Sequence, residues 1–238
     1  AKYYLDGDYM GKWRDEHLRV EGDAVADLQK LFIADWARVR GESLDIRRHI
    51  APHDIRQRLP IQLAWAEEGS SRLTIAEAFA AAIVRAQRRV RISSPYFLPP
   101  AMLLDALRLA ARSGVRVQVM ILTCSDSPFT DLISDSYVGD LLDAGIELYR
   151  YANGFLHAKL LIVDDDTASV GTANMDYRSL LDNLEVTAFI RDRQVVRELS
   201  ATFDGDLASC RRIVRGEWRP AAWRRTLGDV LRLVSPLM

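Results

Sequence analysis

The chain has 238 residues, a formal net charge of −1 at pH 7 and a hydrophobic content of 49%, which suits a folded protein with a sizeable core. The near-zero charge argues against a dedicated nucleic-acid binder, because such proteins are usually strongly basic. No apolar run approaches the roughly 20 residues that cross a bilayer, and the start lacks the pattern of a signal peptide. Cys124 and Cys210 lie far apart without metal-site spacing, so we expect free thiols and no metal.

The first 40 residues contain a loop, a strand and a helix. Residues 1–12 are polar and favour a surface loop, and the alternation over Trp13–Glu21 favours a strand. A helix is predicted from Asp23, and its apolar positions have the spacing of a buried stripe: Val25, Leu28, Leu31, Phe32 and Trp36.

This opening pattern recurs near the end of the chain. Shifting Val25, Leu28, Phe32, Asp35 and Trp36 by 171 positions gives Val196, Leu199, Phe203, Asp206 and Leu207. With a one-residue gap, Asp15 corresponds to Glu185. We therefore interpret residues 1–40 as the C-terminal remnant of an earlier copy of the same unit. The alternative is that any two amphipathic helices ending in an acid look alike.

Residues 41–71 are irregular and are interpreted as a linker that ends in an entry strand at Ile61–Trp65. His49 and His53 are spaced for one helix face, but Pro52 disfavours that helix, so we expect solvated loop histidines. The second unit, residues 72–215, opens with a helix at Thr74, where Glu77 completes a capping box. Strands and helices then alternate: strand 90–94, helix 101–112, strand 115–122, polar loop 123–137, helix 134–144, strand 146–150, and, after the central stretch, strand 184–190 and helix 194–209.

The stretch from Gly154 to Glu185 holds a cluster of an imidazole, an ammonium, small residues and carboxylates. Phe155–Val163 has the apolar run of a buried strand. On a strand His157 and Lys159 would project from one face, because side chains alternate. An imidazole can attack or protonate near neutral pH and an ammonium offsets phosphate charge, so this pair suits phosphate chemistry.

Small and acidic residues follow this pair. A short strand at 167–170 precedes Gly171, Thr172 and Asn174, where the backbone can approach a ligand and donate N–H groups. A carboxylate could hold the imidazole in one tautomer. Asp164, Asp176 and Glu185 are all candidates for it.

The spacing His157-x-Lys159-x4-Asp164-x6-Gly171-Thr172-x-Asn174 resembles the signature of the phospholipase D superfamily. The surrounding GFLHAKLLIVDD and VGTANMDYRSLLDNLEV are most similar to the C-terminal half of bacterial cardiolipin synthases. The resemblance implies that His157 is catalytic, Lys159 and Asn174 bind phosphate, and Glu185 orients His157. It also implies that Asp164 supports the site. Tyr96, in the bend Ser94–Pro100, would contact substrate or simply pack.

The alternation of strands and helices predicts an α/β sandwich with a mixed central sheet flanked by helices, and the resemblance implies a phospholipase D-like one. It further implies a phosphatidyl-transferring phosphodiesterase with a phospholipid substrate, no cofactor, a phosphohistidine intermediate and two catalytic histidines. The second histidine would come from a first-motif domain that precedes Ala1 or from a homodimer mate. Alternatives are a phospholipase D hydrolase, a dimeric single-motif nuclease, although nucleic acid is disfavoured, and an inactive fragment.

The tail, residues 216–238, predicts an amphipathic helix with Trp223, Leu227, Val230, Leu231 and Val234 on one face. Such a helix can lie on an anionic membrane surface or dock on the domain's own core, and the sequence favours neither. With the resemblance, we expect a peripheral protein on the cytoplasmic side of the bacterial inner membrane.

Overall fold

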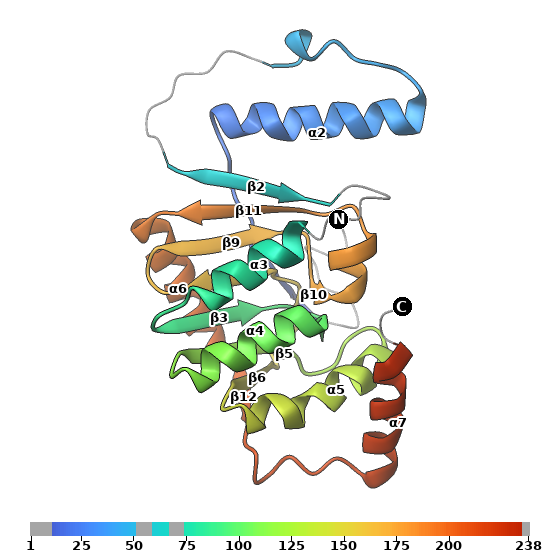
Figure 1. The fold of residues 1–238 in the computed structure, drawn as a ribbon, viewed down its shortest axis with the longest axis vertical. Helices are drawn as coiled ribbons and strands as arrows, with labels where there is room; N and C mark the ends of the chain where they lie inside the picture. Colours follow the sequence, from blue (N-terminus) through green and yellow to red (C-terminus); the bar gives the residue numbers. More distant parts are fainter. Residues whose placement is uncertain (1–10, 51–58, 67–73, 235–238) are drawn as a thin grey trace.

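The computed structural model describes residues 11–50, 59–66 and 74–234 and is built around an eight-stranded mixed sheet (Figure 1). The strand order is β12-β6-β5-β3-β8-β9-β11-β2, and β3, β5 and β6 are parallel while the other neighbours are antiparallel. The strands are β2 (Ile61–Trp65), β3 (Arg89–Ser93), β5 (Arg116–Leu122), β6 (Glu147–Tyr151), β8 (Leu160–Val163), β9 (Thr167–Gly171), β11 (Val186–Arg191) and β12 (Cys210–Ile213).

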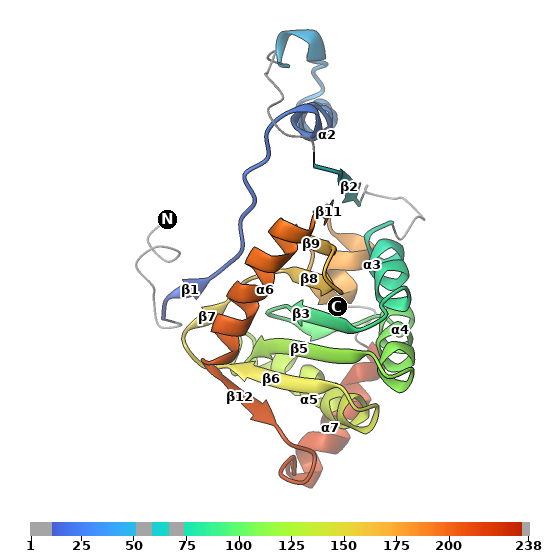
Figure 2. The ribbon, with the colours of Figure 1, turned by 90° about the vertical axis from the view of Figure 1, so that its left-hand side faces the viewer.

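Helices cover both faces of this sheet (Figure 2). On one face lie α3 (Thr74–Val84), α4 (Ala101–Arg112) and α5 (Pro128–Asp143), and on the other lies α6 (Arg193–Leu207). The larger core joins the first three helices to the sheet, and a second core holds Val196, Leu199 and Phe203 of α6 against it. The predicted α/β sandwich with a mixed central sheet is confirmed.

The α6 face of the sheet carries a buried charge. Arg91 in β3 is 5% exposed, and its guanidinium donates to the Asp204 carboxylate at 2.8 Å and to the Gln118 side chain at 3.2 Å. The guanidinium also stacks over the Phe203 ring, 5.2 Å from its centroid. A buried charge is tolerated when it is paired and hydrogen-bonded in this way, so Arg91 ties α6 to the centre of the sheet.

Several predicted boundaries were wrong. Helix α5 begins at Pro128, six residues before the predicted Ser134, because Ser127 caps it by accepting from Thr130 N and Pro128 occupies the first turn. Strand β12 was not predicted. The predicted strand Phe155–Val163 is two strands, β7 (Phe155–Leu156) and β8, with residues 157–159 between them.

The N-terminal strand is short and pairs with the central stretch. β1 comprises only Trp13–Arg14 and lies parallel to β7, with Phe155 N donating to Lys12 O at 2.9 Å and His157 N donating to Arg14 O at 2.7 Å. The rest of the predicted strand at 13–21 has no regular structure. A second small pair joins β4 (Phe97–Leu98) to β10 (Met175–Asp176), also in parallel.

Helix α2 (Asp23–Arg40) forms as predicted, but its apolar stripe is not buried. Val25 is 41% and Phe32 is 53% exposed, whereas the corresponding Val196 and Phe203 of α6 are 0% exposed. Figures 1 and 2 show α2 beyond β2, outside the sandwich. The helix therefore has the apolar spacing of a core helix, but its apolar side chains are left partly exposed. The short helix η1 (Ile46–Arg48) follows it.

Helix α7 (Ala222–Val234) packs on α5. Gly228 permits the close approach, because a Cβ there would lie 2.9 Å from Leu132 O. Nothing in the described ranges forms a helix both long and apolar enough to cross a membrane. Both cysteines are free thiols, as expected.

Candidate active site

His157 is held by a carboxylate from the N-terminal segment. The parallel pairing of β1 with β7 places Asp15 directly beside the imidazole, and His157 Nδ1 lies 2.8 Å from Asp15 Oδ2. The Trp13 ring packs against the imidazole with 5.0 Å between centroids, and the Phe155 ring lies 6.1 Å away. A carboxylate on one ring nitrogen fixes the tautomer and orientation of a histidine, so Asp15 fixes the orientation of this imidazole.

The orienting carboxylate is none of the three sequence candidates. The residues alone left Asp164, Asp176 and Glu185 open and the resemblance implied Glu185, but the structure places Asp15 at Nδ1. The signal for Asp15 was its predicted correspondence with Glu185. What the sequence did not show is that the carboxylate of the N-terminal segment reaches His157.

Lys159 lies next to His157 in the segment between β7 and β8. Its Nζ donates to the backbone oxygen of His157 at 2.5 Å. Burial lowers the pKa of Lys159 to about 8, although Asp15, Glu185 and Asp176 act in the opposite direction. The site thus holds a partly desolvated ammonium within electrostatic range of three carboxylates, and such a group interacts strongly with an anion.

Glu185 lies beside Thr172, at the start of β11. One carboxylate oxygen accepts from the Thr172 hydroxyl, and the other accepts from Asn183 Nδ2 at 3.3 Å. Gly171 is required here by strand packing, because a Cβ would lie 2.5 Å from both Val186 O and the hydroxyl oxygen of Thr187. Gly171 and Thr172 therefore hold β9 against β11 and keep Glu185 near Lys159.

Asp164 lies at the opposite end of β8 from His157. Its carboxylate accepts from three backbone N–H groups, those of Gln87, Arg88 and Arg89, at 2.9, 2.8 and 3.0 Å. Burial alone would raise the pKa of Asp164, but these bonds outweigh it and the pKa lies below its ordinary value. In this geometry Asp164 fixes the turn before β3 and does not touch the histidine.

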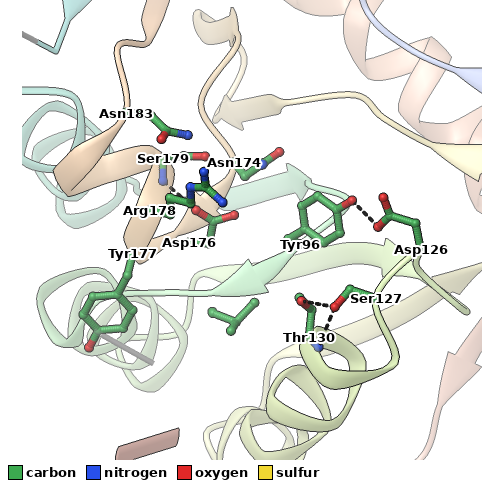
Figure 3. A pocket seen from close by; sticks show the side chains of 11 residues that line it. Tyr96, Asp126, Ser127, Thr130, Asn174, Asp176, Tyr177, Arg178, Ser179 and Asn183 are labelled. Atoms are coloured by element: carbon green, nitrogen blue, oxygen red, sulfur yellow. Dashed lines mark hydrogen bonds between the residues drawn. The ribbon is translucent and has the colours of Figure 1, made fainter. Parts of the chain in front are cut away.

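A cavity of about 380 Å³ is bordered by β4, β10 and the start of α5 (Figure 3). Its lining includes Tyr96, Asp126, Asn174, Asp176 and Arg178. His157 and Lys159 do not line it. The link between the cavity and this pair is Asp176, a lining residue whose charge raises the pKa of Lys159.

The polar groups of the cavity are unevenly satisfied. The Tyr96 hydroxyl donates to Asp126 Oδ1 at 2.6 Å, and burial together with this carboxylate raises the pKa of Tyr96. Burial raises the pKa of Asp176 even though Ser179 N donates to it at 2.7 Å. The buried amide oxygen of Asn174 has no partner among the described residues. A buried polar atom without a partner is costly and is common where a ligand binds.

Arg178 is a lining residue that sequence reasoning missed. Its side chain is exposed, and across the described ranges its guanidinium has no hydrogen bond or ion pair. An unpaired guanidinium at the edge of a cavity suits a phosphate group, because its donors match phosphate geometry. In the same described part of the chain, no group of three or more His, Cys, Asp or Glu side chains could hold a metal ion.

Comparison with known sequences gives two findings. Residues 79–207 match the family model described as the cardiolipin synthase, phospholipase D-like domain. The chain is 40% identical over 233 residues to the major cardiolipin synthase of Bacillus subtilis, covering 96% of this chain and 48% of that protein. It is 37% identical over 251 residues to a cardiolipin synthase of Staphylococcus aureus, covering 99% of this chain and 50% of that protein. The chain thus spans about half the length of these relatives.

Comparison with solved structures shows the fold. The phospholipase D family member Nuc of Salmonella typhimurium superposes with a TM-score of 0.56 at 21% identity, covering 66% of this chain and 99% of that one. The phosphatidylserine synthase of Haemophilus influenzae superposes with a TM-score of 0.60 at 14% identity, covering 76% of this chain and 48% of that one. At these identities the likeness concerns the fold alone.

Proposed function

Because the chain belongs to the cardiolipin synthase, phospholipase D-like domain family, we propose that it supplies one half of a phosphatidyl-transferring phosphodiesterase site. The observation that carries the proposal is the contact of His157 Nδ1 with Asp15 at 2.8 Å beside the half-buried ammonium of Lys159. This arrangement gives an oriented imidazole next to a cation, which is what exchange at a phosphodiester requires.

The reaction needs two histidines. One attacks the phosphorus of a phospholipid through Nε2, so that a P–N bond forms and the P–O bond to the leaving alcohol breaks. The other histidine gives its proton to that oxygen. An acceptor alcohol then transfers its proton to the second histidine and attacks the phosphorus, which restores the first imidazole. His157 takes one of these two roles.

The neighbouring groups would hold the phosphate. Lys159, with a pKa of about 8, is mostly protonated at neutral pH and offsets charge on the non-bridging oxygens. Asn174 offers its amide next to the unpaired Arg178. Thr172 and Gly171 fix this edge of the sheet, and Asp164 supports the strand from its far end.

The other histidine would come from a second copy of the unit, in the same polypeptide or in a partner chain. Asp15 belongs to the remnant of one copy and contacts the histidine of the other. If the two copies are related by an approximate two-fold axis, Glu185 in turn contacts the missing histidine. This reassigns Glu185 from His157 to its counterpart. We keep as part of the proposal the division predicted from the sequence, into residues 1–40, 41–71, 72–215 and 216–238.

The cavity would receive the polar head of the acceptor. The hydroxyl and carboxylate groups that line the cavity suit a polyol head group. Phosphatidylglycerol is an acceptor with such a head group. Water as the acceptor would make the protein a hydrolase. Tyr96, held by Asp126 at 2.6 Å, would form the wall that contacts this group. A substrate embedded in lipid places the protein at the surface of a membrane, and we assign it to the cytoplasmic side of the inner membrane.

The test uses the complete gene product that contains this chain, with vesicles of phosphatidylglycerol labelled in the head-group glycerol. Release of glycerol and formation of cardiolipin are measured for the wild type, for His157→Ala and for His49→Ala. His49 is an exposed histidine outside the site and serves as the control. We expect a loss of about 10³-fold or more with His157→Ala only.

Two results would overturn the proposal. One is lipid turnover that does not respond to His157→Ala. The other is cleavage of DNA without lipid turnover, which would assign the same site to a nuclease. Release of glycerol with no cardiolipin formed would instead make water the acceptor and the protein a phospholipase D.

A further inference from the structure

Helix α7 is docked on the domain and still presents an apolar face to solvent. Trp223, Leu227 and Val230 are 64%, 42% and 54% exposed. Positions i, i+4 and i+7 lie on one side of a helix, so these side chains form a single stripe. Leu233, at the edge of the stripe, is 80% exposed. We call these four residues the α7 stripe.

The contacts that hold α7 come from another side of the helix. Gly228 is buried against Leu132 and Ser136 of α5. The Arg232 guanidinium lies 3.9 Å from the centroid of the Tyr137 ring and 2.8 Å from Asp140 Oδ2. These contacts fix which side of α7 faces α5. The stripe therefore faces outward while the helix is packed on α5. The sequence left open whether this helix docks on the domain or lies on a membrane surface. In the structure the helix is docked and still has an exposed apolar face.

The charge around α7 differs from that of the rest of the chain. Residues 211–232 contain seven arginines and two acidic residues, a formal charge of +5, while the whole chain carries −1. Three of these arginines, Arg215, Arg224 and Arg232, pair with aspartates of α5. Arg219 and Arg225 are exposed, and within the described ranges neither has an ion-pair partner. Arg224 lies over the Trp223 ring, 5.8 Å from its centroid. An apolar stripe flanked by free arginines has the composition of a helix that lies on an anionic interface.

Helix α5 connects this surface to the cavity. Ser127 and Thr130, at its start, line the cavity, and its later turns carry α7. Arg232 and Tyr137 both influence the pKa of Tyr177, which is another residue that lines the cavity. Figure 1 shows α7 at the edge of the molecule, beside α5. A surface that contacted the α7 stripe would therefore lie close to the cavity.

We propose that the α7 stripe inserts into the surface of a bilayer that contains anionic phospholipids, while α7 stays packed on α5. The free arginines contact lipid phosphates, and the four apolar side chains enter the boundary of the acyl chains. A second copy of the chain is the other occupant that an apolar stripe could take, but the concentration of positive charge would make that contact repulsive. The membrane surface is favoured on charge complementarity.

The experiment is vesicle co-flotation of the full chain. Vesicles are neutral phosphatidylcholine, or the same lipid with about one third phosphatidylglycerol. The test variant is Trp223→Ser/Leu227→Ser/Val230→Ser. The matched control is Val84→Ser/Met102→Ser/Leu109→Ser on α3 and α4, where the side chains are 52%, 38% and 54% exposed. Both variants leave the charge unchanged and alter only exposed positions.

We expect the partition coefficient on anionic vesicles to fall about tenfold or more in the test variant, with the control unchanged, because the serine side chains no longer bury apolar surface in the membrane. Wild-type binding should weaken on neutral vesicles and at high salt. Unchanged binding by the test variant would overturn the proposal, and so would a wild-type dimer that the test variant dissociates while binding persists. His157→Ala should bind like the wild type, so failure here is separate from failure of the proposed catalysis.

Discussion

Asp15 Oδ2 lies 2.8 Å from His157 Nδ1 although 142 residues separate them in the chain. The contact follows from two backbone hydrogen bonds between β1 and β7, at 2.9 and 2.7 Å, which fix the register of the two segments. The carboxylate that orients His157 therefore comes from outside the stretch Gly154–Glu185 that contains the motif. The consequence is that the geometry of His157 depends on a segment far away in the chain.

Asp15→Asn tests this dependence. An amide can present either a donor or an acceptor to Nδ1, so it no longer enforces one tautomer, and we expect transfer by the complete gene product to fall about 10²-fold or more. Binding of vesicles should not change. Nitrogen NMR of His157 in the chain should show a mixture of tautomers where the wild type shows the Nδ1–H form. Glu21→Gln, at an exposed carboxylate with 71% side-chain exposure, is the control and should leave both readouts unaltered.

Much of the sandwich could be predicted from periodicity. The strands and helices alternate clearly, and α4 was placed at Ala101–Arg112 as the structure has it. The predicted start of α5 is late because Ser127 and Pro128 lie in a polar stretch typical of a loop, whereas in the structure they form the cap and the first turn of the helix. β12 was missed because Cys210–Ile213 has two exposed arginines and no apolar run. The local sequence pattern does not reveal an edge strand that is stabilised only by pairing with its neighbouring strand.

The site was harder to predict, because it joins distant segments. The positions of His157, Lys159 and Asn174 came from their spacing. The carboxylate partner of His157 could not be predicted in this way. Spacing along one segment contains no information about which acidic residue of another segment lies beside the histidine. The expectation that His157 and Lys159 share the face of one strand also failed in detail, since they lie between β7 and β8 and are joined by a bond from Nζ to a backbone oxygen.

Lys159→Met should stabilise the chain at neutral pH while abolishing transfer. The pKa of Lys159 is about 8 in the fold against an ordinary 10.5, so the folded state disfavours the charged form. The cost is fully present below pH 8 and disappears as the pH rises through 10.5, where the unfolded state also loses the proton.

We expect a gain of about 1–2 kcal/mol in the free energy of unfolding at pH 7, after allowance for partial exposure and for the lost bond to His157 O. Urea titrations of the wild type and of Lys159→Met at pH 7 and pH 10.5 measure the difference. A variant that is less stable at pH 7, or a difference that grows toward pH 10.5, would show that burial does not penalise the ammonium.

Gly171→Ala should destabilise the junction of β9 and β11. The new Cβ would lie 2.5 Å from Val186 O and 2.6 Å from Thr187 Cα, so backbone has to move, at a cost of about 1–3 kcal/mol. Gly139→Ala in α5 is the matched control, because no atom lies within 4 Å of its added Cβ, and it should be neutral or stabilising by about 0.5–1 kcal/mol. Thermal unfolding of both variants is the measurement, and equal melting temperatures would contradict the packing account of Gly171.

The central claim is that His157 belongs to a pair of histidines that exchange a phosphatidyl group through a covalent P–N bond. The most direct measurement is an acid-free quench of the complete gene product during turnover of phosphatidylglycerol, followed by digestion and mass spectrometry of histidine-containing peptides. We predict a phosphatidyl adduct on one histidine in the wild type. In His157→Ala the adduct is absent if His157 is the nucleophile, and it stays on the other histidine with slowed transfer if His157 is the proton donor. Transfer at the wild-type rate in His157→Ala, or lipid transfer by the wild type without any histidine adduct, would contradict the account.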